Sequence, residues 1–291
     1  MKEIKLIIST ILLILFITSN SFAGELIAVK TKTYKKPVVQ RLVAYEAYII
    51  VDAETGIVLE EANSDLLRPL ASVTKIMLAC VVIDKINNGE VQLNDIITAP
   101  KKAERIGGTS VFLKRGETFT LEELMQAIMI QSANDASYAV AEHIAGSVPS
   151  FIVLMNNKAQ ELGMTNTVYN SVHGLPPAKG EQDNISTCID MIKLAQEALK
   201  SEKLLEWAST EYTIFRKSVI FNHNKLLGKM PEYIDGIKTG FTRRAGFNIV
   251  ATGKNDERRI IMVILGSSAP SLRDGFAEIK FREYLIKGEG G

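Results

Sequence analysis

ASVTKIMLACVVI, residues 71–83, is the stretch of sequence that decides the fold. It predicts a helix from about Ser72 to Asn87, with a glycine two positions later as the stop signal. Residues 76–83 are apolar on every side of that helix, so we expect it to be buried rather than amphipathic. Polar side chains at the start of a buried helix need a reason, which makes Ser72 and Lys75 candidates for chemistry.

Strand patterns lie near both ends of the chain, and helical patterns lie between them. The strand-like runs are Tyr48–Val51, Ile57–Leu59, Ile234–Gly240, Phe247–Ala251 and Arg259–Leu265, with a closing helix at about Ser271–Ile286. A capping box at Thr120 and Glu123 opens the helical middle. We therefore expect an α/β (α+β) fold: one antiparallel sheet built from both termini, flanking helices, and an inserted all-helical lobe at about 90–210. The long connection Met164–Ile185 is expected to be functional or mobile.

The N-terminus has the features of an export signal. A short positive region precedes an almost wholly apolar run, Leu6–Ile17, and residues 21–23 (SFA) supply a small-x-small cleavage pattern. We expect residues 1–23 to be a signal peptide, residues 24–43 a flexible basic leader, and residues 44–291 the folded domain, exported to the outer side of the cytoplasmic membrane. The apolar run is short for a full membrane span, so both cleavage and retention as an anchor stay open. Membrane contact is expected only if the segment is uncleaved.

The composition argues against several classes of function. The 291 residues carry 34 Lys and Arg against 33 Asp and Glu, and a net charge of +1 gives no electrostatic case for nucleic acid as a partner. His143, His173 and His223 are far apart in sequence and form no His-Glu-x-x-His pattern, so a zinc hydrolase is not expected. Cys80 and Cys188 are expected to be buried free thiols, although a bridge between them stays open.

The spacing of Ser72 and Lys75 puts a hydroxyl and an amine on one face of a helix, within reach of each other. A serine needs a neighbouring base to become a nucleophile, and a lysine can serve if an apolar setting lowers its pKa. The apolar run after Lys75 offers such a setting. The pattern Ser-x-x-Lys is short, however, and alone it fits a helix-cap serine with a surface lysine better than a catalytic pair.

Two further short motifs are informative only in combination with Ser-x-x-Lys. Ser132-Ala-Asn134 falls in a break between helical segments, and Lys238-Thr-Gly240 lies on a strand. Taken alone, the former is an ordinary helix cap and the latter an edge lysine before a turn glycine. Together, in this order and on these elements, the three motifs are the signature of β-lactamases and penicillin-binding proteins.

Beyond these motifs, the chain resembles the low-molecular-mass D-alanyl-D-alanine carboxypeptidases from about Ala44 to Leu285. The matching segments are residues 52–59, 71–75, 132–136, 151–156, 162–167, 173–176 and 235–242. The resemblance implies a β-lactamase/transpeptidase-like fold without a cofactor. It also implies that the substrates are D-Ala-D-Ala ends of peptidoglycan peptide stems and that β-lactams are covalent inhibitors.

The resemblance further implies a role for each matching residue of the helical motifs. Ser72 is expected to attack the carbonyl of the terminal D-Ala–D-Ala bond, and Lys75 to accept its proton. Ser132 is expected to relay a proton to the leaving amine, while Asn134 holds Lys75 and the substrate backbone. These four residues are the expected catalytic group.

The sheet strand supplies the rest of the expected site. The resemblance implies that the backbone N–H groups of Ser72 and Phe241 form the oxyanion hole. It also implies that Lys238, Thr239 and Gly240 bind substrate, with Lys238 setting the electrostatics of the cleft and Thr239 contacting the substrate carboxylate.

Several positions depart from the family pattern or carry a weaker match. Arg273 follows the last strand where the family often has a carboxylate-binding arginine. Leu70 and Ala133 replace a usual proline and a common glycine, and His223 stands where many members carry arginine or threonine. Since the chain ends soon after its closing helix, the β-rich C-terminal domain and amphipathic anchor of longer members are not expected.

Three other functions compete with carboxypeptidase activity. A D,D-endopeptidase that cuts cross-links uses the same residues, and the sequence does not separate the two. A class A β-lactamase would need a Glu-x-Glu-Leu-Asn string, whereas the long connection holds Glu181 and no such string. A catalytically inactive wall-binding module conflicts with the complete set of motifs.

Overall fold

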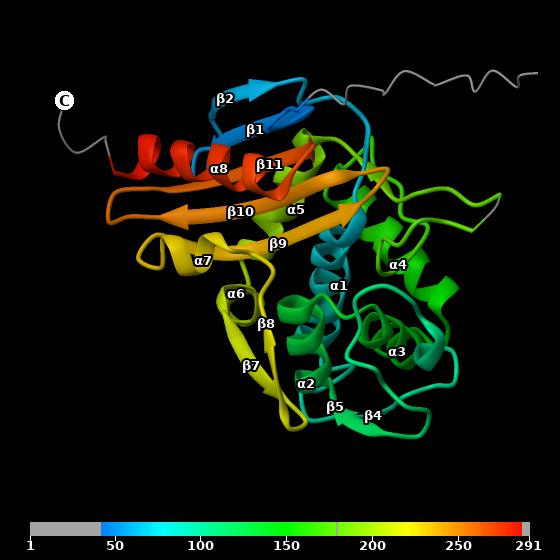
Figure 1. Ribbon diagram of the computed structural model, residues 1–291. Coiled ribbons are helices and arrows are strands. Elements are labelled where there is room, and N and C mark those ends of the chain that lie inside the picture. Colours follow the sequence, from blue (N-terminus) through cyan, green and yellow to red (C-terminus); the bar gives the residue numbers. More distant parts are fainter. Residues whose placement is uncertain (1–41, 179, 287–291) are drawn as a thin grey trace, which may run out of the picture. The chain divides into compact units, whose positions relative to one another are not determined.

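The computed structural model describes residues 42–178 and 180–286 (Figure 1). Its centre is a five-stranded antiparallel sheet in the order β2-β1-β11-β10-β9. The strands are β1 (Ala47–Asp52), β2 (Val58–Ala62), β9 (Ile234–Thr242), β10 (Gly246–Lys254) and β11 (Arg259–Ser267). The prediction that both ends of the chain build one sheet is therefore confirmed. The predicted signal peptide and nearly all of the predicted leader lie outside the described residues.

The sheet is covered on both faces, which follows from the alternation of side chains along its strands. In β1, Ile49 and Val51 join the core formed with the central helices, while Tyr48 and Ile50 join the core under the closing helix. That helix, α8 (Pro270–Leu285), lies along β10 and β11 (Figure 1). Because both faces are buried, the strands are continuous apolar runs in the sequence.

The helical part lies on the other face of the sheet. Its helices are α1 (Lys75–Asn87), α2 (Leu121–Gln126), α3 (Asn134–Ala145), α4 (Val148–Glu161), α5 (Cys188–Leu199) and α6 (Glu202–Ser209), with α7 (Leu226–Lys229) beside β9. Residues 75–83 of α1 are all buried, so the predicted burial of this helix is confirmed. The capping box of Thr120 and Glu123 is also present, at the start of α2.

Two helix boundaries differ from the sequence prediction, and both differences fall at the candidate residues. Ser72 lies in a 3-10 turn, η1 (Ala71–Thr74), and the α-helix starts only at Lys75. The predicted helix after Thr120 is α-helical only to Gln126 and continues as a π-helical turn, η3 (Ala127–Gln131). Ser132 then takes a left-handed conformation with φ 64°. Long-range contacts with the sheet and with neighbouring loops set these turns, and helical periodicity does not report them.

Several short elements had no prediction. The pairs β3 (Arg68–Pro69) with β6 (Ile185–Ser186) and β4 (Ile96–Thr98) with β5 (Thr118–Thr120) lie in or beside the helical lobe, and β7 (Tyr212–Phe215) pairs with β8 (Ser218–Phe221). Strands of two to four residues are too short for a periodic signal.

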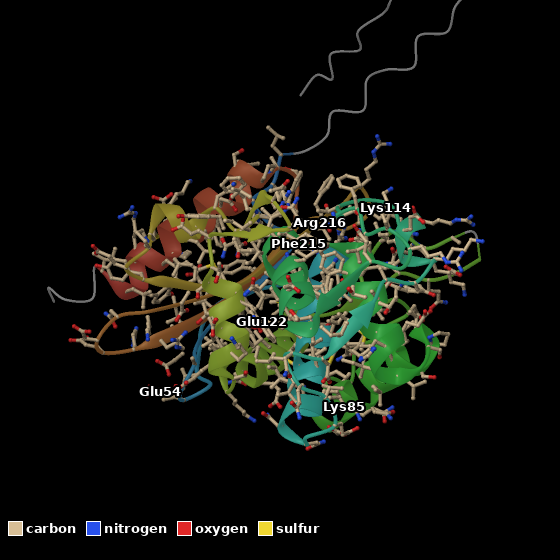
Figure 2. The ribbon with its side chains drawn as sticks, turned by 90° about the horizontal axis from the view of Figure 1, so that it is seen from below. Glu54, Lys85, Lys114, Glu122, Phe215 and Arg216 are labelled. Carbon is tan, nitrogen blue, oxygen red and sulfur yellow. The ribbon has the colours of Figure 1, made fainter. Side chains whose placement is uncertain are left out.

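The β7–β8 hairpin also lacks the alternation of apolar and polar residues that marks a strand, because its exposed face is apolar as well as its buried face. Tyr212 and Ile214 on this exposed face are open to solvent, whereas Phe215 is buried and stacks on Phe119 at 4.9 Å. Arg216 at the tip donates to the carbonyl oxygens of Val111 and Phe112, so the hairpin lies against the loop that carries Lys114 (Figure 2).

The two cysteines lie in the hydrophobic core. Cys80 and Cys188 are both buried and unpaired, as the preferred prediction had it, and burial raises the pKa of each thiol.

Within residues 42–178 and 180–286, no single helix meets the length and hydropathy needed to cross a membrane, while α3 and α4 meet them only as a pair bent by 86°.

Strand β9 makes its closest approach to the turn η1 at Gly240. A Cβ atom built on Gly240 would lie 2.8 Å from the backbone nitrogen of Ser72 and 2.9 Å from that of Val73. Atoms this close cannot coexist without movement of one backbone relative to the other. A glycine is therefore what allows the sheet edge and η1 to touch at this point.

We expect Gly240→Ala to lower the free energy of unfolding by about 1–3 kcal/mol, because a buried methyl group would force the two backbones apart. Denaturant unfolding would measure the change. The matched control is Gly275→Ala on α8, where an added Cβ meets no atom within 4 Å, so stability should stay equal or rise. Equal stability of the two variants would contradict this account of the contact.

Candidate active site

The amine of Lys75 stands at the centre of the candidate site. Its Nζ lies 3.1 Å from Ser72 Oγ, 2.7 Å from Asn134 Oδ1 and 2.9 Å from the carbonyl oxygen of His173. The side chain is completely buried. Three segments far apart in the sequence thus meet at one nitrogen atom: the start of α1, the start of α3 and the long connection after α4.

Burial and neighbouring charge favour the neutral form of this amine. Burial comes first and the positive charge of Lys238 second, and together they hold the pKa of Lys75 well below its usual value of 10.5. The Asp135 carboxylate opposes the shift more weakly. A neutral amine has two N–H donors and one lone pair. The acceptors on Asn134 and His173 can take both donors, which leaves the lone pair for the Ser72 hydroxyl.

Lys238 is the second buried lysine of the site. Burial, and then the charge of Arg273, lower the pKa of Lys238 from 10.5 to about 7. Among the described residues, the Nζ of Lys238 makes one long hydrogen bond, 3.4 Å, to the Thr239 carbonyl oxygen. Its charge is therefore held in a poorly compensated environment that an anionic ligand would relieve.

Ser132 presents an unpartnered hydroxyl to the site. Among the described residues, its buried Oγ has no hydrogen-bond partner. The left-handed conformation after η3 turns this residue toward the cavity that also contains Ser72. Such an orphaned polar atom is costly unless something binds it, which is consistent with a group that hydrogen-bonds a ligand or passes on a proton.

The cavity connects these groups with the edge of the sheet. Its volume is about 350 Å³, and its lining residues are Ser72, Thr109, Ser132, His223, Thr239, Gly240, Phe241, Phe247, Pro270 and Arg273. All of the residues predicted for the site either line this cavity or, like Lys75, Asn134 and Lys238, are buried next to it. Within the described residues, no group of three His, Cys, Asp or Glu side chains could hold a metal ion.

Two residues with weaker sequence arguments also reach the cavity. Arg273 is buried, but its guanidinium is paired with Asp274 at 2.6 Å and donates to the Asn248 carbonyl oxygen. Part of its charge is therefore already compensated. His223 lines the cavity although the residue as a whole is exposed; partial removal of its imidazole from water, followed by the charge of Lys238, lowers its pKa to about 4, so the imidazole is neutral at pH 7.

Asn248 is a positioning residue that sequence analysis missed. Its side-chain nitrogen donates to the carbonyl oxygens of Pro69 and Leu70, at 2.9 and 3.0 Å, and its Oδ1 accepts from the Gly266 N–H at 2.8 Å. The amide thereby ties the segment before Ser72 to the sheet. The available signal was an asparagine inside the apolar strand run FNIVA, residues 247–251.

Asp135 is the second such residue. Its buried carboxylate accepts from Ser110 Oγ at 2.6 Å and from the N–H groups of Val111 and Leu113 at 3.2 and 2.9 Å. These bonds fix the loop before β5 against the start of α3, next to Asn134. The only available signal was an acidic residue at a helix start, and acidic residues are common there for other reasons.

The long connection after α4 also contributes to the site. At Gly174, with φ +76°, an added Cβ would lie 1.9 Å from the Ala71 carbonyl oxygen, so the loop presses on η1. Asn184 donates to Thr74 Oγ1 at 2.9 Å from the other end of the same loop. The contact of the His173 carbonyl with Lys75 places this connection at the candidate site. Glu181 is exposed in the loop, where it accepts from the Ala178 N–H.

Comparison with known proteins bears on the same site. The family model described as D-alanyl-D-alanine carboxypeptidase, Peptidase_S11, matches residues 31–269. D-alanyl-D-alanine carboxypeptidase DacC of Escherichia coli is 39% identical over 240 residues, which cover 78% of this chain and 58% of that protein. The chain thus spans little more than half the length of this relative.

Solved structures agree with the sequence comparison. Penicillin-binding protein 6B from Escherichia coli superimposes with a TM-score of 0.77 at 28% identity, covering 84% of this chain and 79% of that one. Penicillin-binding protein D2 from Listeria monocytogenes, in its ampicillin-bound form, gives a TM-score of 0.74 at 28% identity, covering 81% and 95%. The predicted penicillin-binding-protein fold is therefore confirmed, and the chain belongs to the D-alanyl-D-alanine carboxypeptidase family, peptidase S11.

Proposed function

We propose that this chain is an exported serine D,D-carboxypeptidase that removes the terminal D-Ala from peptidoglycan pentapeptide stems through an acyl-enzyme on Ser72. The observation that carries the proposal is the buried Lys75 amine, 3.1 Å from Ser72 Oγ, with acceptors for both of its N–H groups. Family membership and the match to carboxypeptidases support it. The predicted export signal in residues 1–23 supports action outside the cytoplasmic membrane.

Acylation starts with transfer of the Ser72 hydroxyl proton to the lone pair of Lys75. Ser72 Oγ then bonds to the carbonyl carbon of the terminal D-Ala–D-Ala bond, and the carbonyl electron pair moves onto oxygen. The N–H groups of Ser72 and Phe241 stabilise this oxyanion, a contribution of about 3–4 kcal/mol per donor in well-studied enzymes. The close approach of β9 to η1 at Gly240 supports this pairing of donors.

Collapse of the tetrahedral intermediate needs a proton on the leaving amine. Lys75 holds the proton taken from Ser72, and the unpartnered Ser132 hydroxyl can pass it to the amine while the C–N bond breaks. D-Ala then leaves. Water attacks the ester, Lys75 accepts a proton from it, and Ser72 Oγ recovers that proton as the acyl group departs. Asn134 keeps Lys75 in place throughout.

The free carboxylate of the substrate is the natural partner of the positive end of the cavity. Lys238 supplies positive charge and Thr239 a hydroxyl donor. Arg273 supplies a guanidinium that also forms an ion pair with Asp274. Binding of a carboxylate here relieves the poorly compensated charge of Lys238 and selects peptides with a free C-terminus. β-Lactams carry an equivalent carboxylate, so we propose them as covalent inhibitors.

Substrate choice is tested by offering a pentapeptide and a cross-linked dimer in parallel. We expect release of D-Ala from the pentapeptide with multiple turnovers, and no release in Ser72→Ala. Unchanged thermal unfolding of that variant is the control for its fold. Efficient cleavage of the dimer alone would assign the chain as an endopeptidase, and activity of Ser72→Ala would refute the nucleophile.

The penicilloyl adduct on Ser72 is expected to persist for minutes or longer. The amine of an opened β-lactam stays tethered in the cavity, and Glu181 is exposed in its loop rather than placed to activate water. Intact-mass spectrometry after mixing with one equivalent of penicillin follows the adduct, and peptide mapping locates it. Loss of the adduct within seconds, with excess lactam hydrolysed, would identify a β-lactamase instead.

The pH profile of kcat/KM should report Lys238. Because its pKa is about 7, this lysine loses its charge as pH rises through neutrality, and kcat/KM should fall on the alkaline side. Lys238→Arg keeps the charge at every accessible pH, so its alkaline limb should move to higher pH. An alkaline limb at the same pH in both enzymes would show that another group titrates there.

A further inference from the structure

Two aromatic rings form one wall of the cavity that contains Ser72. Phe241 on β9 and Phe247 on β10 are cross-strand neighbours, and their rings stack with centroids 4.1 Å apart and planes 20° apart. Both rings and Pro270 line the cavity. Phe241 nevertheless remains 52% exposed. A ring that is fixed on one side by stacking and open on the other is a ready contact surface for a ligand.

The position of this wall relates it to one part of the substrate. Phe241 follows Thr239 by two residues, so both side chains stand on the same face of β9. Thr239 is proposed to meet the carboxylate of the leaving D-Ala, and the Phe241 N–H to meet the scissile carbonyl oxygen. An extended substrate that runs along β9 from Thr239 to Phe241 therefore brings its acyl portion, N-terminal to the scissile bond, onto the rings.

Within the described residues, no further strand pairs with β9 on this side. β9 ends the order β2-β1-β11-β10-β9, and within the described residues it pairs with β10 alone. An edge strand of this kind can take an extended peptide as an additional strand, with main-chain bonds giving affinity and side-chain contacts giving selectivity.

We propose that the Phe241–Phe247 pair, together with Pro270, is a specificity-determining apolar wall that selects substrates with an aliphatic or aromatic group on the acyl side. This proposal rests on the proposed acylation of Ser72. A ligand that covers the open face of Phe241 removes apolar surface from water and completes a ring stack or a ring–aliphatic contact. Ligands without such a group lose this contribution but keep their contacts with Thr239 and Lys238.

The test compares two penicillins with the same bicyclic nucleus: benzylpenicillin, which has an aromatic acyl group, and 6-aminopenicillanic acid, which has none. Intact-mass spectrometry gives the second-order rate constant for acylation of Ser72 by each. We expect the ratio of the two constants to fall about tenfold in Phe241→Ala and in Phe247→Ala, equivalent to about 1.4 kcal/mol. Phe241→Trp, which keeps a ring on the wall, should retain the ratio.

Phe221→Ala is the matched control, because Phe221 is 58% exposed but does not line this cavity. Its ratio should equal that of the wild type. In D-Ala release, Phe241→Ala and Phe247→Ala should lose the preference of the wild type for acetyl-Leu-D-Ala-D-Ala over acetyl-Gly-D-Ala-D-Ala.

Two results would overturn the inference while leaving the acyl-enzyme intact. One is an unchanged ratio in both alanine variants. The other is an equal fall in both rate constants, which would mean that the rings act on the nucleophile rather than on the ligand. Absence of acylation of the wild-type chain by either penicillin is a different outcome and would refute the proposed function itself.

Discussion

The burial of a single amine is the constraint on which the rest of the site depends. Lys75 occupies the first position of a helix whose next eight residues are also buried, and its side chain is shielded from bulk water. An ammonium ion there would be strongly destabilised, whereas a neutral amine with two acceptors is tolerated. The apolar sequence of α1 therefore does more than fill the core, because it sets the protonation state on which the proposed activation of Ser72 depends.

Several long-range contacts keep the partners of that amine in place. The Asp135 carboxylate anchors a loop beside Asn134, and Asn248 ties the chain before Ser72 to the sheet. Gly174 lets the long connection press on η1, which places the His173 carbonyl against the amine. Each of these contacts joins segments that are distant in sequence, so the site is a meeting point of the sheet and the helical lobe rather than the property of one element.

The sequence predicted those features that repeat locally and missed those that depend on distant partners. The strands and long helices follow from apolar runs and from the capping box at Thr120, and the three short motifs located the residues that the structure brings together. The role of Asn248 was not predictable, because its acceptors lie 178 and 179 positions away. The 3-10 turn at Ser72 and the β7–β8 hairpin were missed because tertiary contacts override, or do not register in, the local pattern.

The construction of the sheet from both termini has a consequence for the order of events during synthesis. Ala47 of β1 pairs with Leu265 of β11. The first strand to be synthesised can therefore pair with its neighbour in the centre of the sheet only after the last strand has been made. Ser72 and Lys75 leave the ribosome early, yet the strand that carries Lys238 comes late. Pairing of strands this far apart in the sequence raises the contact order, so the sheet cannot be completed before β11 has been made. Delayed completion of the sheet is compatible with the export proposed above.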